Sequence, residues 1–306
     1  MVQPEKALKL SVCVITYNQE HYIRECLKSI VNQQTDFDFE IIVGDDFSTD
    51  NTREVVLEFS RLYPEKIVPV FYPEKVGGTH NFITVHNQAV GHYVAHIDGD
   101  DIALPGKLQM QVDYLDKHSD CTVVWHRMEL FNDAGTLNQN NLNDVDMFPE
   151  GKVYLSDVLK FGSIGYHSSM MYRASARKTR EAKGPMLDYY YTVEMLMAGR
   201  GSYLEDVLGR YRYNINTGIS KKGRGSKLVM QIYAQHLEYY FLRDAKFRRD
   251  LFINSLIYLL VEAKNGRSSA IYFLRLAMKT ISVISPWEFL AHLKRFRRIN
   301  AGVKGG

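Results

Sequence analysis

The sequence predicts an α/β protein whose mostly parallel sheet is flanked by helices and followed by a helical C-terminal region. Two observations lead to this prediction. Over the first 115 residues, short apolar runs rich in β-branched residues alternate with stretches of helical periodicity. After residue 226, helical periodicity continues without a further strand pattern. Strands alternating with helices are typical of right-handed βαβ units, which build a doubly wound parallel sheet.

Four apolar runs are expected to form buried strands, over residues 8–15, 40–44, 67–72 and 91–97. Helices are expected between and after them, over residues 20–33, 55–62, 80–90 and 105–115. The first helix follows from Ile23, Cys26, Leu27 and Ile30, which recur on one helical face. Further along, strands are expected at 121–125, 166–172 and 205–213, the last at an edge of the sheet, and a helix at 187–199.

Three of these strands end in polar clusters, which are Thr16-Tyr17-Asn18, Asp45-Asp46 and Asp98-Gly99-Asp100-Asp101. In doubly wound sheets, ligands bind outside the carboxyl ends of the strands. The three carboxylates at the fourth strand repel one another unless a cation is present. Hard oxygen ligands of this kind suit Mg²⁺ or Mn²⁺ held jointly with phosphate. The alternative is an acidic turn that caps the following helix.

The composition is that of an ordinary globular protein, with 45% hydrophobic and 24% charged residues. Its net charge of +3 is unevenly distributed, because residues 1–200 carry −9 and residues 201–306 carry +12. The basic second part suggests an anionic partner. Three scattered cysteines, no secretory signal pattern and no apolar run of membrane-spanning length favour a cytoplasmic protein.

The segments VCVITYNQEHYIRECLKSIVNQ, FEIIVGDDFSTDNT and GHYVAHIDGDDIALPGKL together resemble the family 2 glycosyltransferases. The likeness covers residues 10–115 and continues more weakly to about 220. It implies the GT-A fold, a Rossmann-like fold of nucleotide-diphospho-sugar transferases. We expect a GT-A domain over residues 1–222, with a nucleotide-binding half at about 8–115 and an acceptor half at about 116–222, and a helical region over 223–306.

The resemblance also implies roles for the polar clusters. Tyr17 would stack on the nucleotide base, with Thr16 nearby, unless it packs on its own helix. Asp46 would accept a hydrogen bond from the base with Asp45 as its helper, although either carboxylate can instead cap a helix or turn. Asp98 would contact ribose or metal, and Asp100 would hold the metal on the diphosphate. Two further assignments are a loop-fixing role for Asp101 and, for Asn81, either a nucleotide contact or a surface turn.

The acceptor half offers a candidate catalytic base. Residues 187–199 resemble the family helix E-D-x-D-L-W-L-R-L-A-x-x-G, whose acidic start carries that base. Asp188 takes this place, and Leu187 stands where the family often has Glu. Glu194 is the reserve candidate, and Asp188 can alternatively cap the helix. Trp125 and His126 can reach an acceptor or belong to the core, with the core favoured.

The C-terminal third is basic. Residues 214–224 resemble the segment with which the family closes over the diphosphate, which implies phosphate contacts for Lys222 or its neighbours Lys221 and Arg224, the alternative being a solvated linker. Four helices are expected at 228–242, 247–263, 270–284 and 286–298. The last carries aromatic and basic residues and can bind an anionic membrane or pack on its own domain. No recognition motif for nucleic acid accompanies the arginines.

The resulting hypothesis is an inverting, metal-dependent glycosyltransferase. A nucleotide sugar, with UDP favoured, would donate to a hydroxyl of a growing surface glycan such as O-antigen, capsule or exopolysaccharide. The acceptor can be lipid-linked at the cytoplasmic face of the inner membrane. Two alternatives are a catalytically inactive nucleotide- or glycan-binding protein and a receiver-like signalling module with Asp45 or Asp46 as phosphoacceptor.

Overall fold

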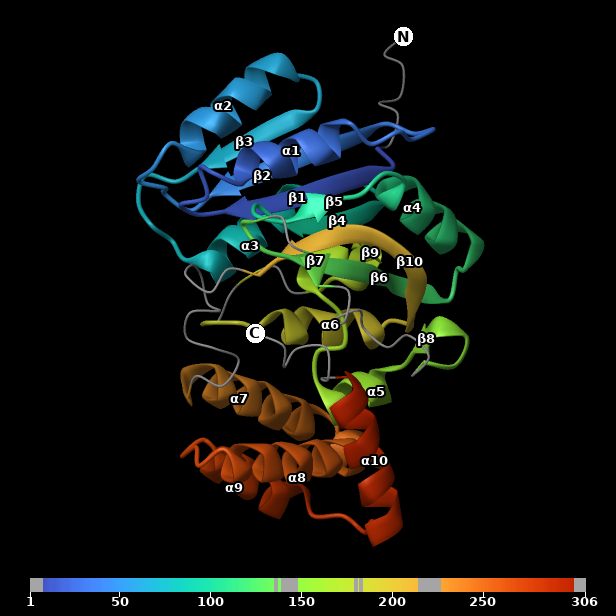
Figure 1. The fold of residues 1–306 in the computed structure, drawn as a ribbon. Helices are drawn as coiled ribbons and strands as arrows, with labels where there is room; N and C mark the ends of the chain where they lie inside the picture. The colour runs from blue at the N-terminus through green and yellow to red at the C-terminus, as the bar shows by residue number, and fades with distance from the viewer. Residues whose placement is uncertain are drawn as a thin grey trace.

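The computed structural model describes residues 8–134, 137–138, 148–178, 181, 184–213 and 227–299. Within these ranges, ten strands form one mixed sheet (Figure 1). They are β1 (Leu10–Thr16), β2 (Phe39–Asp45), β3 (Ile67–Phe71), β4 (Tyr93–Asp98), β5 (Ile102–Ala103), β6 (Cys121–Phe131), β7 (Leu137–Asn138), β8 (Lys152–Val153), β9 (Met171–Arg173) and β10 (Arg200–Arg212).

The strand order along the sheet is β3-β2-β1-β4-β9-β6-β10-β5. Strands β3, β2, β1 and β4 are mutually parallel, as the alternation of strands and helices predicted. Strand β9 runs antiparallel to both of its neighbours, β4 and β6, and β6 and β10 are again parallel to each other. The fold class predicted from the sequence is therefore confirmed.

The described helices are α1 (Ile23–Val31), α2 (Thr52–Leu62), α3 (Gly78–Gln88), α4 (Lys107–Lys117), α5 (Leu155–Phe161), α6 (Asp188–Leu196), α7 (Lys227–Arg243), α8 (Arg248–Lys264), α9 (Ala270–Thr280) and α10 (Pro286–Ile299). Helices α1, α2 and α4 cover one face of the sheet, where they pack on Val12 and Val14 of β1. Helices α3 and α6 cover the other face, onto which the intervening Cys13 points. Alternate residues of β1 thus enter two separate cores.

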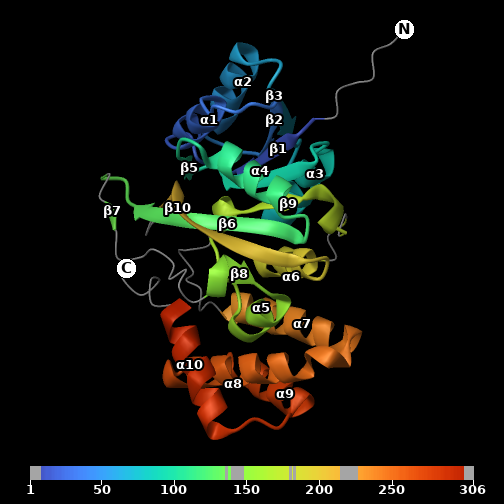
Figure 2. The same cartoon turned by 90° about the vertical axis from the view of Figure 1, so that its right-hand side faces the viewer.

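The C-terminal helices lie beyond α6, on the far side from α1 and α2 (Figures 1 and 2). A separate small core of Phe161, Ile253, Ile257 and Phe296 joins α5, α8 and α10. Among the helices that the structure describes, none has both the length and the apolar character needed to cross a bilayer. A domain boundary at residue 222 stays a proposal, because that residue lies outside the described ranges.

Two strand predictions need correction. Residues 166–172 do not form one strand, because His167–Ser169 make a 3₁₀ turn and only β9 follows. The backbone N–H and the hydroxyl of Ser169 both donate to the carbonyl of Tyr166, at 3.0 and 2.7 Å, which closes this turn. Strand β10 begins at Arg200 and is not a bare edge, since β6 pairs with one side of it and the short β5 and β8 with the other.

Candidate active site

The polar ends of β1, β2 and β4 lie side by side. In the strand register, Thr16 is opposite Asp45, and Ile15 is opposite Asp98. The N–H of Asp46 donates to the carbonyl of Thr16 at 3.0 Å, and the N–H of Gly99 donates to the carbonyl of Ile15 at 2.9 Å. Backbone hydrogen bonds therefore join the three clusters into one edge. Figure 1 shows these strands ending on the left, where α3 and α6 both begin.

Gly99 allows the backbone at the end of β4 to lie close to Thr16 and Gln19. A Cβ atom at this position would lie 2.6 Å from Oε1 of Gln19 and 2.9 Å from Cβ of Thr16. The hydroxyl of Thr16 donates to the same Gln19 oxygen at 2.8 Å. Any side chain at residue 99 would thus displace Thr16 and Gln19, and with them the junction between β1 and β4.

The two carboxylates at the end of β2 have different partners. Asp45 is fully buried and accepts from Nε of Arg53 and the N–H of Ser48, both at 3.2 Å. Asp46 accepts the N–H groups of Val76 and Gly77 through one oxygen, Oδ1, at 2.8 and 2.9 Å. Asp46 thereby fixes the loop before α3, while Asp45 is held by an ion pair within its own βα unit.

Tyr17 is accessible next to these carboxylates, with 38% of its surface exposed. The ammonium of Lys75 lies 3.4 Å from the centroid of its ring, a cation–π contact. Lys75 belongs to the loop whose end Asp46 holds, and its ammonium covers the ring that the resemblance assigns to base stacking. Sequence reasoning did not single out Lys75, because its contact with Tyr17 spans 58 residues of chain.

The acidic cluster at the end of β4 has electrostatics that suit a cation. Burial, and then the negative charge of Asp98, raise the pKa of Asp100 to about 7. Burial and the charges of Asp100 and Asp98 raise the pKa of Asp101 well above its ordinary value. Asp101 accepts the N–H of Arg212 at 2.9 Å and so joins the cluster to β10. The loop-fixing role suggested for Asp101 agrees with this contact.

Arg212 lies against the cluster, but its ion pairs are with other carboxylates. Its guanidinium forms ion pairs with Glu25 at 2.7 Å and Asp133 at 3.3 Å, and its Nε donates to the carbonyl oxygen of Asp100 at 3.0 Å. It also lies over the rings of Tyr22 and Phe131. The carboxylates of Asp98 and Asp100 therefore keep oxygen donors that fit Mg²⁺ or Mn²⁺.

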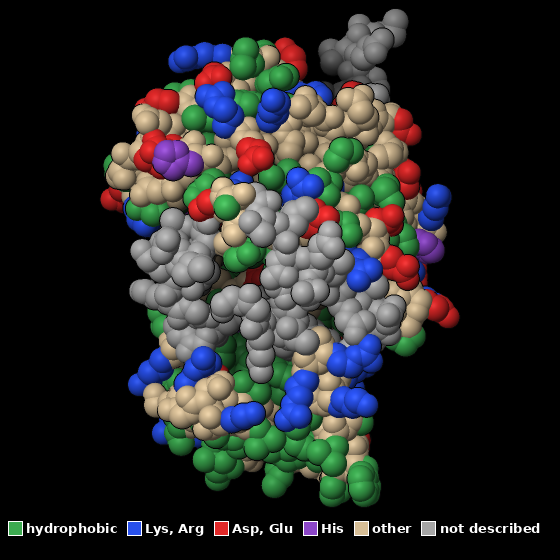
Figure 3. Space-filling view, in the orientation of Figure 1, with side chains coloured by type: hydrophobic (Ala, Val, Ile, Leu, Met, Phe, Trp, Pro, Cys, Tyr) green, Lys and Arg blue, Asp and Glu red, His purple; other side chains and the backbone are tan. Residues whose placement is uncertain are grey.

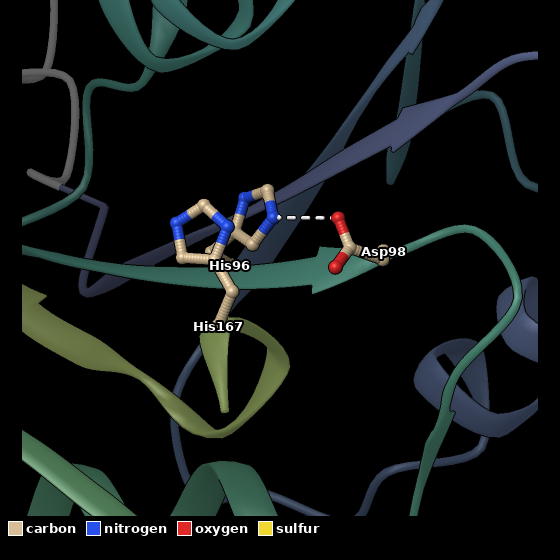
Figure 4. Close-up of side chains that lie close together, drawn as sticks. All are labelled: His96, Asp98 and His167. Carbon is tan, nitrogen blue, oxygen red and sulfur yellow. Dashed lines mark hydrogen bonds and ion pairs between the residues drawn. The ribbon is translucent and has the colours of Figure 1, made fainter. Parts of the chain in front are cut away.

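A column of two buried histidines, His96 and His86, supports Asp98 from inside the sheet, and Figure 4 shows the contact of His96 with Asp98. Nε2 of His96 lies 3.1 Å from Oδ1 of Asp98, and its Nδ1 lies 3.0 Å from Nε2 of His86. Nδ1 of His86 lies 2.7 Å from the hydroxyl of Tyr172. Because a carboxylate only accepts, a neutral His96 donates from Nε2, His86 donates to His96, and Tyr172 donates to His86.

His96, Asp98 and His167 could also hold a metal ion, since their ligand atoms all lie within 4.8 Å of one another. However, the rings of His96 and His167 stack with centroids 3.8 Å apart and planes 28° from parallel. Nearly parallel rings direct their nitrogen lone pairs side by side rather than toward one point. This geometry favours support of Asp98 over a three-ligand site, and it leaves the buried Nε2 of His167 without a hydrogen-bond partner.

The surface turn considered for Asn81 is wrong, whereas the helix expected at 80–90 is confirmed. Asn81 lies inside α3, with only 1% of its surface exposed. Its amide donates to the carbonyl of Gly44 at 2.9 Å and accepts from the hydroxyl of Tyr72 at 3.2 Å. In this structure Asn81 thus attaches α3 to Gly44, the residue of β2 immediately before Asp45.

Asp188 is the first residue of α6, with Leu187 at the N-cap position. Two residues before Asp188, the N–H of Met186 donates at 3.1 Å to the hydroxyl of Thr79 in the first turn of α3. The loop fixed by Asp46 leads directly into that turn, so the start of α6 is attached beside the strand ends. Glu194 lies six residues further along α6, about 9 Å along its axis.

Of the remaining candidates, Trp125 and His126 belong to the core, with 2% and 0% of their surfaces exposed. Nε2 of His126 lies 2.7 Å from the buried ammonium of Lys107. Lys222 and its neighbours Lys221 and Arg224 lie outside the described residues.

Comparison with known proteins decides the family. Residues 11–179, more than half of the chain, match the family model described as Glycosyl transferase family 2. The chain belongs to glycosyl transferase family 2. A receiver-like signalling module is therefore excluded, and the resemblance drawn from the three sequence motifs is confirmed.

Two relatives illustrate how far the likeness extends. This family 2 glycosyltransferase is 39% identical over 127 residues to the uncharacterized protein Rv1520 of Mycobacterium tuberculosis, a match that covers 41% of this chain and 37% of that protein. It is 34% identical over 158 residues to the UDP-Glc:alpha-D-GlcNAc-diphosphoundecaprenol beta-1,3-glucosyltransferase WfgD of Escherichia coli, covering 51% of this chain and 57% of WfgD. The chain thus spans well under two thirds of either relative.

Solved structures confirm the GT-A fold. The chain is similar to residues 1–349 of S. aureus TarS in complex with UDP-GlcNAc, with a TM-score of 0.62 and 21% identity over 97% of this chain and 92% of that one. The mannosyltransferase PcManGT from Pyrobaculum calidifontis, in complex with GDP-Man and Mn²⁺, aligns with a TM-score of 0.53 and 17% identity over 96% and 86% of the two chains.

Proposed function

We propose that this protein transfers a sugar, with inversion, from a nucleotide-sugar donor to an acceptor hydroxyl. The observation that supports this most directly is the junction of three polar strand ends, in which Thr16 pairs with Asp45 and β4 delivers Asp98 beside them. In doubly wound sheets this edge is where ligands bind. UDP is the favoured nucleotide, because TarS and WfgD are named with UDP-sugar donors.

The donor would lie along this edge. Tyr17 would stack on the base once Lys75 moves from its ring, and Asp46 would accept from the base through the oxygen that does not hold Val76 and Gly77. Asp98 and Asp100 would hold Mg²⁺ or Mn²⁺ against the diphosphate. When bound there, the ion supplies Lewis-acid stabilisation of the leaving diphosphate. PcManGT, which shares the fold, was solved with Mn²⁺.

In the transfer step, Asp188 would take the proton of the acceptor hydroxyl. The hydroxyl oxygen then bonds to the anomeric carbon from the face opposite the diphosphate, and the bond from that carbon to the phosphate oxygen breaks. The nucleoside diphosphate leaves with the electron pair. The position of Asp188 at the start of α6, next to the segment tied to Thr79, supports it over Glu194. General-base catalysis of this kind contributes about 10²- to 10⁴-fold to the rate.

The acceptor we propose is a growing bacterial surface glycan carried on a lipid diphosphate. WfgD is named for an acceptor on diphosphoundecaprenol. Such an acceptor is confined to the membrane, and so the enzyme would work as a peripheral protein at the cytoplasmic face, in contact with anionic lipid. No direct role for nucleic acid is proposed.

A melting-temperature panel tests the donor site. UDP, GDP, CDP and their sugars are added with Mn²⁺ or with EDTA, and we expect a nucleotide that binds the folded state to raise the melting temperature. We expect the largest rise with a UDP-sugar and Mn²⁺, and a much smaller one in Asp100→Ala. If no nucleotide raises the melting temperature in Mn²⁺, the proposed donor site is wrong.

Turnover separates the enzyme from an inactive binding protein, an alternative that Leu187 keeps open because the family often has Glu there. Donor hydrolysis and transfer to a lipid-diphosphate-linked sugar are measured with the stabilising donor. We expect transfer that Asp188→Asn abolishes. Binding without transfer to any such acceptor would instead identify a nucleotide-binding protein.

A further inference from the structure

The C-terminal helices present an apolar surface that no described part of the chain covers. On α9, Ile271, Leu274 and Met278 recur every three or four residues and all face solvent, with Met278 70% exposed. The connection to α10 continues this surface with Ile281 and Val283, the latter 92% exposed. We call this set, together with Trp287 and Leu290 of α10, the apolar tip.

The apolar tip lies at one end of the molecule. Figures 1 and 2 place the α9–α10 connection at the end opposite α2, and Figure 3 shows hydrophobic side chains gathered over this end. Lys and Arg side chains form a band further from the end (Figure 3). Trp287, with 81% of its surface exposed, stands at the start of α10. Isolated exposed apolar residues are ordinary, but a contiguous set of this kind marks an interaction surface.

Helix α10 packs on its own domain, which is one of the two alternatives that the sequence left open. Its inner face is not available to a partner, because Phe296 is buried against Phe161 and Ile257, with Phe289 and Leu293 packed beside them. Among the large apolar side chains whose exposure is described over residues 286–298, Trp287 and Leu290 in the first turns are the exposed ones. The helix therefore does not lie flat with all its aromatic residues in a membrane. It packs on α5 and α8 and presents its N-terminal end.

Basic residues follow the apolar ones along the same face of α10. Residues 287, 290, 294 and 297 are spaced by three and four, so exposed Lys294 and Arg297 lie in line with Trp287 and Leu290. At 1.5 Å per residue, Lys294 is about 10 Å and Arg297 about 15 Å further from the tip than Trp287. Apolar groups of interfacial helices enter the boundary of the acyl chains by about 5–10 Å, which would put Lys294 at the level of the lipid phosphates.

The net charge of the helical region also favours an anionic surface as its partner. Residues 227–299 contain thirteen Lys and Arg against five Asp and Glu, a net charge of +8. Each of the five acidic residues has a basic partner, in the pairs Glu238–Lys279, Asp244–Lys246, Asp250–Lys160, Glu262–Arg267 and Glu288–Arg249. The excess charge is therefore carried by Lys and Arg. An anionic surface complements it, whereas a second copy of the same basic region would be repelled.

We propose that the apolar tip inserts into an anionic lipid bilayer, with Lys294 and Arg297 contacting the phosphates, and that this end-on contact orients the enzyme on the membrane. The inference deepens the peripheral membrane contact in the proposed function by assigning the surface that makes it. Its test does not require catalysis, so failure of the donor site and failure of the tip are measured separately.

The test is flotation of the purified protein with vesicles of phosphatidylcholine alone or with 30% phosphatidylglycerol. We expect binding to the anionic vesicles that weakens in high salt. The pair Met278→Ser and Trp287→Ser should lower the partition coefficient at least about tenfold, because two large apolar side chains no longer enter the bilayer. The pair Lys294→Gln and Arg297→Gln should lower it by a similar factor on anionic vesicles only.

Matched controls come from the opposite end of the molecule. Leu62→Ser with Val90→Ser removes apolar residues that are 63% and 72% exposed, and Lys28→Gln with Arg61→Gln removes two exposed cations. Neither pair should change vesicle binding. Melting temperatures of all four double variants should stay close to that of the wild type, because the altered side chains are exposed.

Tryptophan emission gives a second readout without loss of folding. The chain has two tryptophans, and Trp125 is buried with 2% of its surface exposed. Anionic vesicles should therefore shift the emission of Trp287 alone to the blue, and Trp287→Phe should remove the shift. The proposal is wrong if the wild type does not float, if the tip and control pairs behave alike, or if the tip pair converts a dimer to a monomer in solution, which would assign the surface to a second copy.

Discussion

Nε2 of His96 donates a hydrogen bond to Oδ1 of Asp98 over 3.1 Å, since residues two positions apart on a strand lie on the same face. Strand β4 ends at Asp98. His96 is fully buried, and its Nδ1 accepts a hydrogen bond from His86 in the interior. Although burial raises it, this hydrogen bond leaves the pKa of Asp98 below its ordinary value. Asp98 is thus kept ionised and oriented at the strand end.

Replacing His96 should weaken metal-dependent nucleotide binding. His96→Leu removes the donor to Asp98, and loss of such a supporting hydrogen bond typically costs a metal site about 10- to 100-fold in affinity. His96→Gln retains an N–H group at similar reach and should retain most of the affinity. Calorimetric titration of UDP in Mn²⁺ measures both. Equal affinities of the leucine variant and the wild type would show that His96 does not position Asp98.

The two oxygens of Asp46 can be separated by substitution. Asp46→Asn keeps a carbonyl oxygen for the N–H groups of Val76 and Gly77, but it replaces the second oxygen with a donor. We expect an unchanged melting temperature and a loss of uridine nucleotide affinity of about tenfold or more, since a hydrogen bond to a charged group contributes about 1.5–3 kcal/mol. Asp46→Ala should lower both quantities. If Asp46→Asn binds UDP normally, Asp46 is purely structural.

The sequence predicted the sheet edge well because the information is local. Each of these strands is a run of apolar, β-branched residues that ends at a polar cluster. Parallel pairing places the ends of neighbouring strands at the same edge, as the pairing of Thr16 with Asp45 shows. The 3₁₀ turn at His167–Ser169 was missed because no Gly, Pro, Asn or Asp marks it, while Tyr166 before it and Met170, Met171 and Tyr172 after it resemble the residues of a buried strand. A surface turn was considered for Asn81 because Gly77 and Gly78 indicate a loop, whereas Gly77, with φ of +87°, directly precedes α3.

Side-chain partners of the site were mostly beyond sequence reasoning. Arg212 contacts Asp101 across 111 residues and Glu25 across 187, and no periodicity or motif records such pairings. The histidine column is similar, since His86 and His96 are recognisable as partners only when α3 lies against β4. In both cases the topology of the sheet, rather than a local pattern, determines which residues meet.

The catalytic base can be assigned by comparing two carboxylates of α6. Asp188→Asn should lower kcat by about 10²- to 10⁴-fold and leave the affinity for UDP unchanged, because the proposed base contacts the acceptor and not the nucleotide. Glu194→Gln, about 9 Å further along the helix, serves as the matched control and should retain most of the activity. A larger loss in Glu194→Gln than in Asp188→Asn would reverse the assignment.

Asp100 should make the stability of the metal-free protein depend on pH. Its folded-state pKa of about 7 lies above the ordinary value of 3.8, because burial and Asp98 disfavour its charge. The folded state therefore holds a proton that the unfolded state has released. The stabilising contribution of protonated Asp100 is complete below the unfolded pKa and is lost as the pH rises through 7.

Asp100→Asn isolates this contribution, because the amide stays neutral at every pH while the buried histidines and Asp101 are present in both proteins. In EDTA, the variant should melt above the wild type by a margin that is smaller at pH 5 than at pH 8, because the wild type loses the contribution of protonated Asp100 progressively between the unfolded and the folded pKa. Adding Mn²⁺ should raise the melting temperature of the wild type, more at pH 8 than at pH 6, since the ion competes with the proton for the carboxylate. The variant should respond little to Mn²⁺. A difference between the two proteins in EDTA that shrinks as the pH rises would contradict the raised pKa of Asp100.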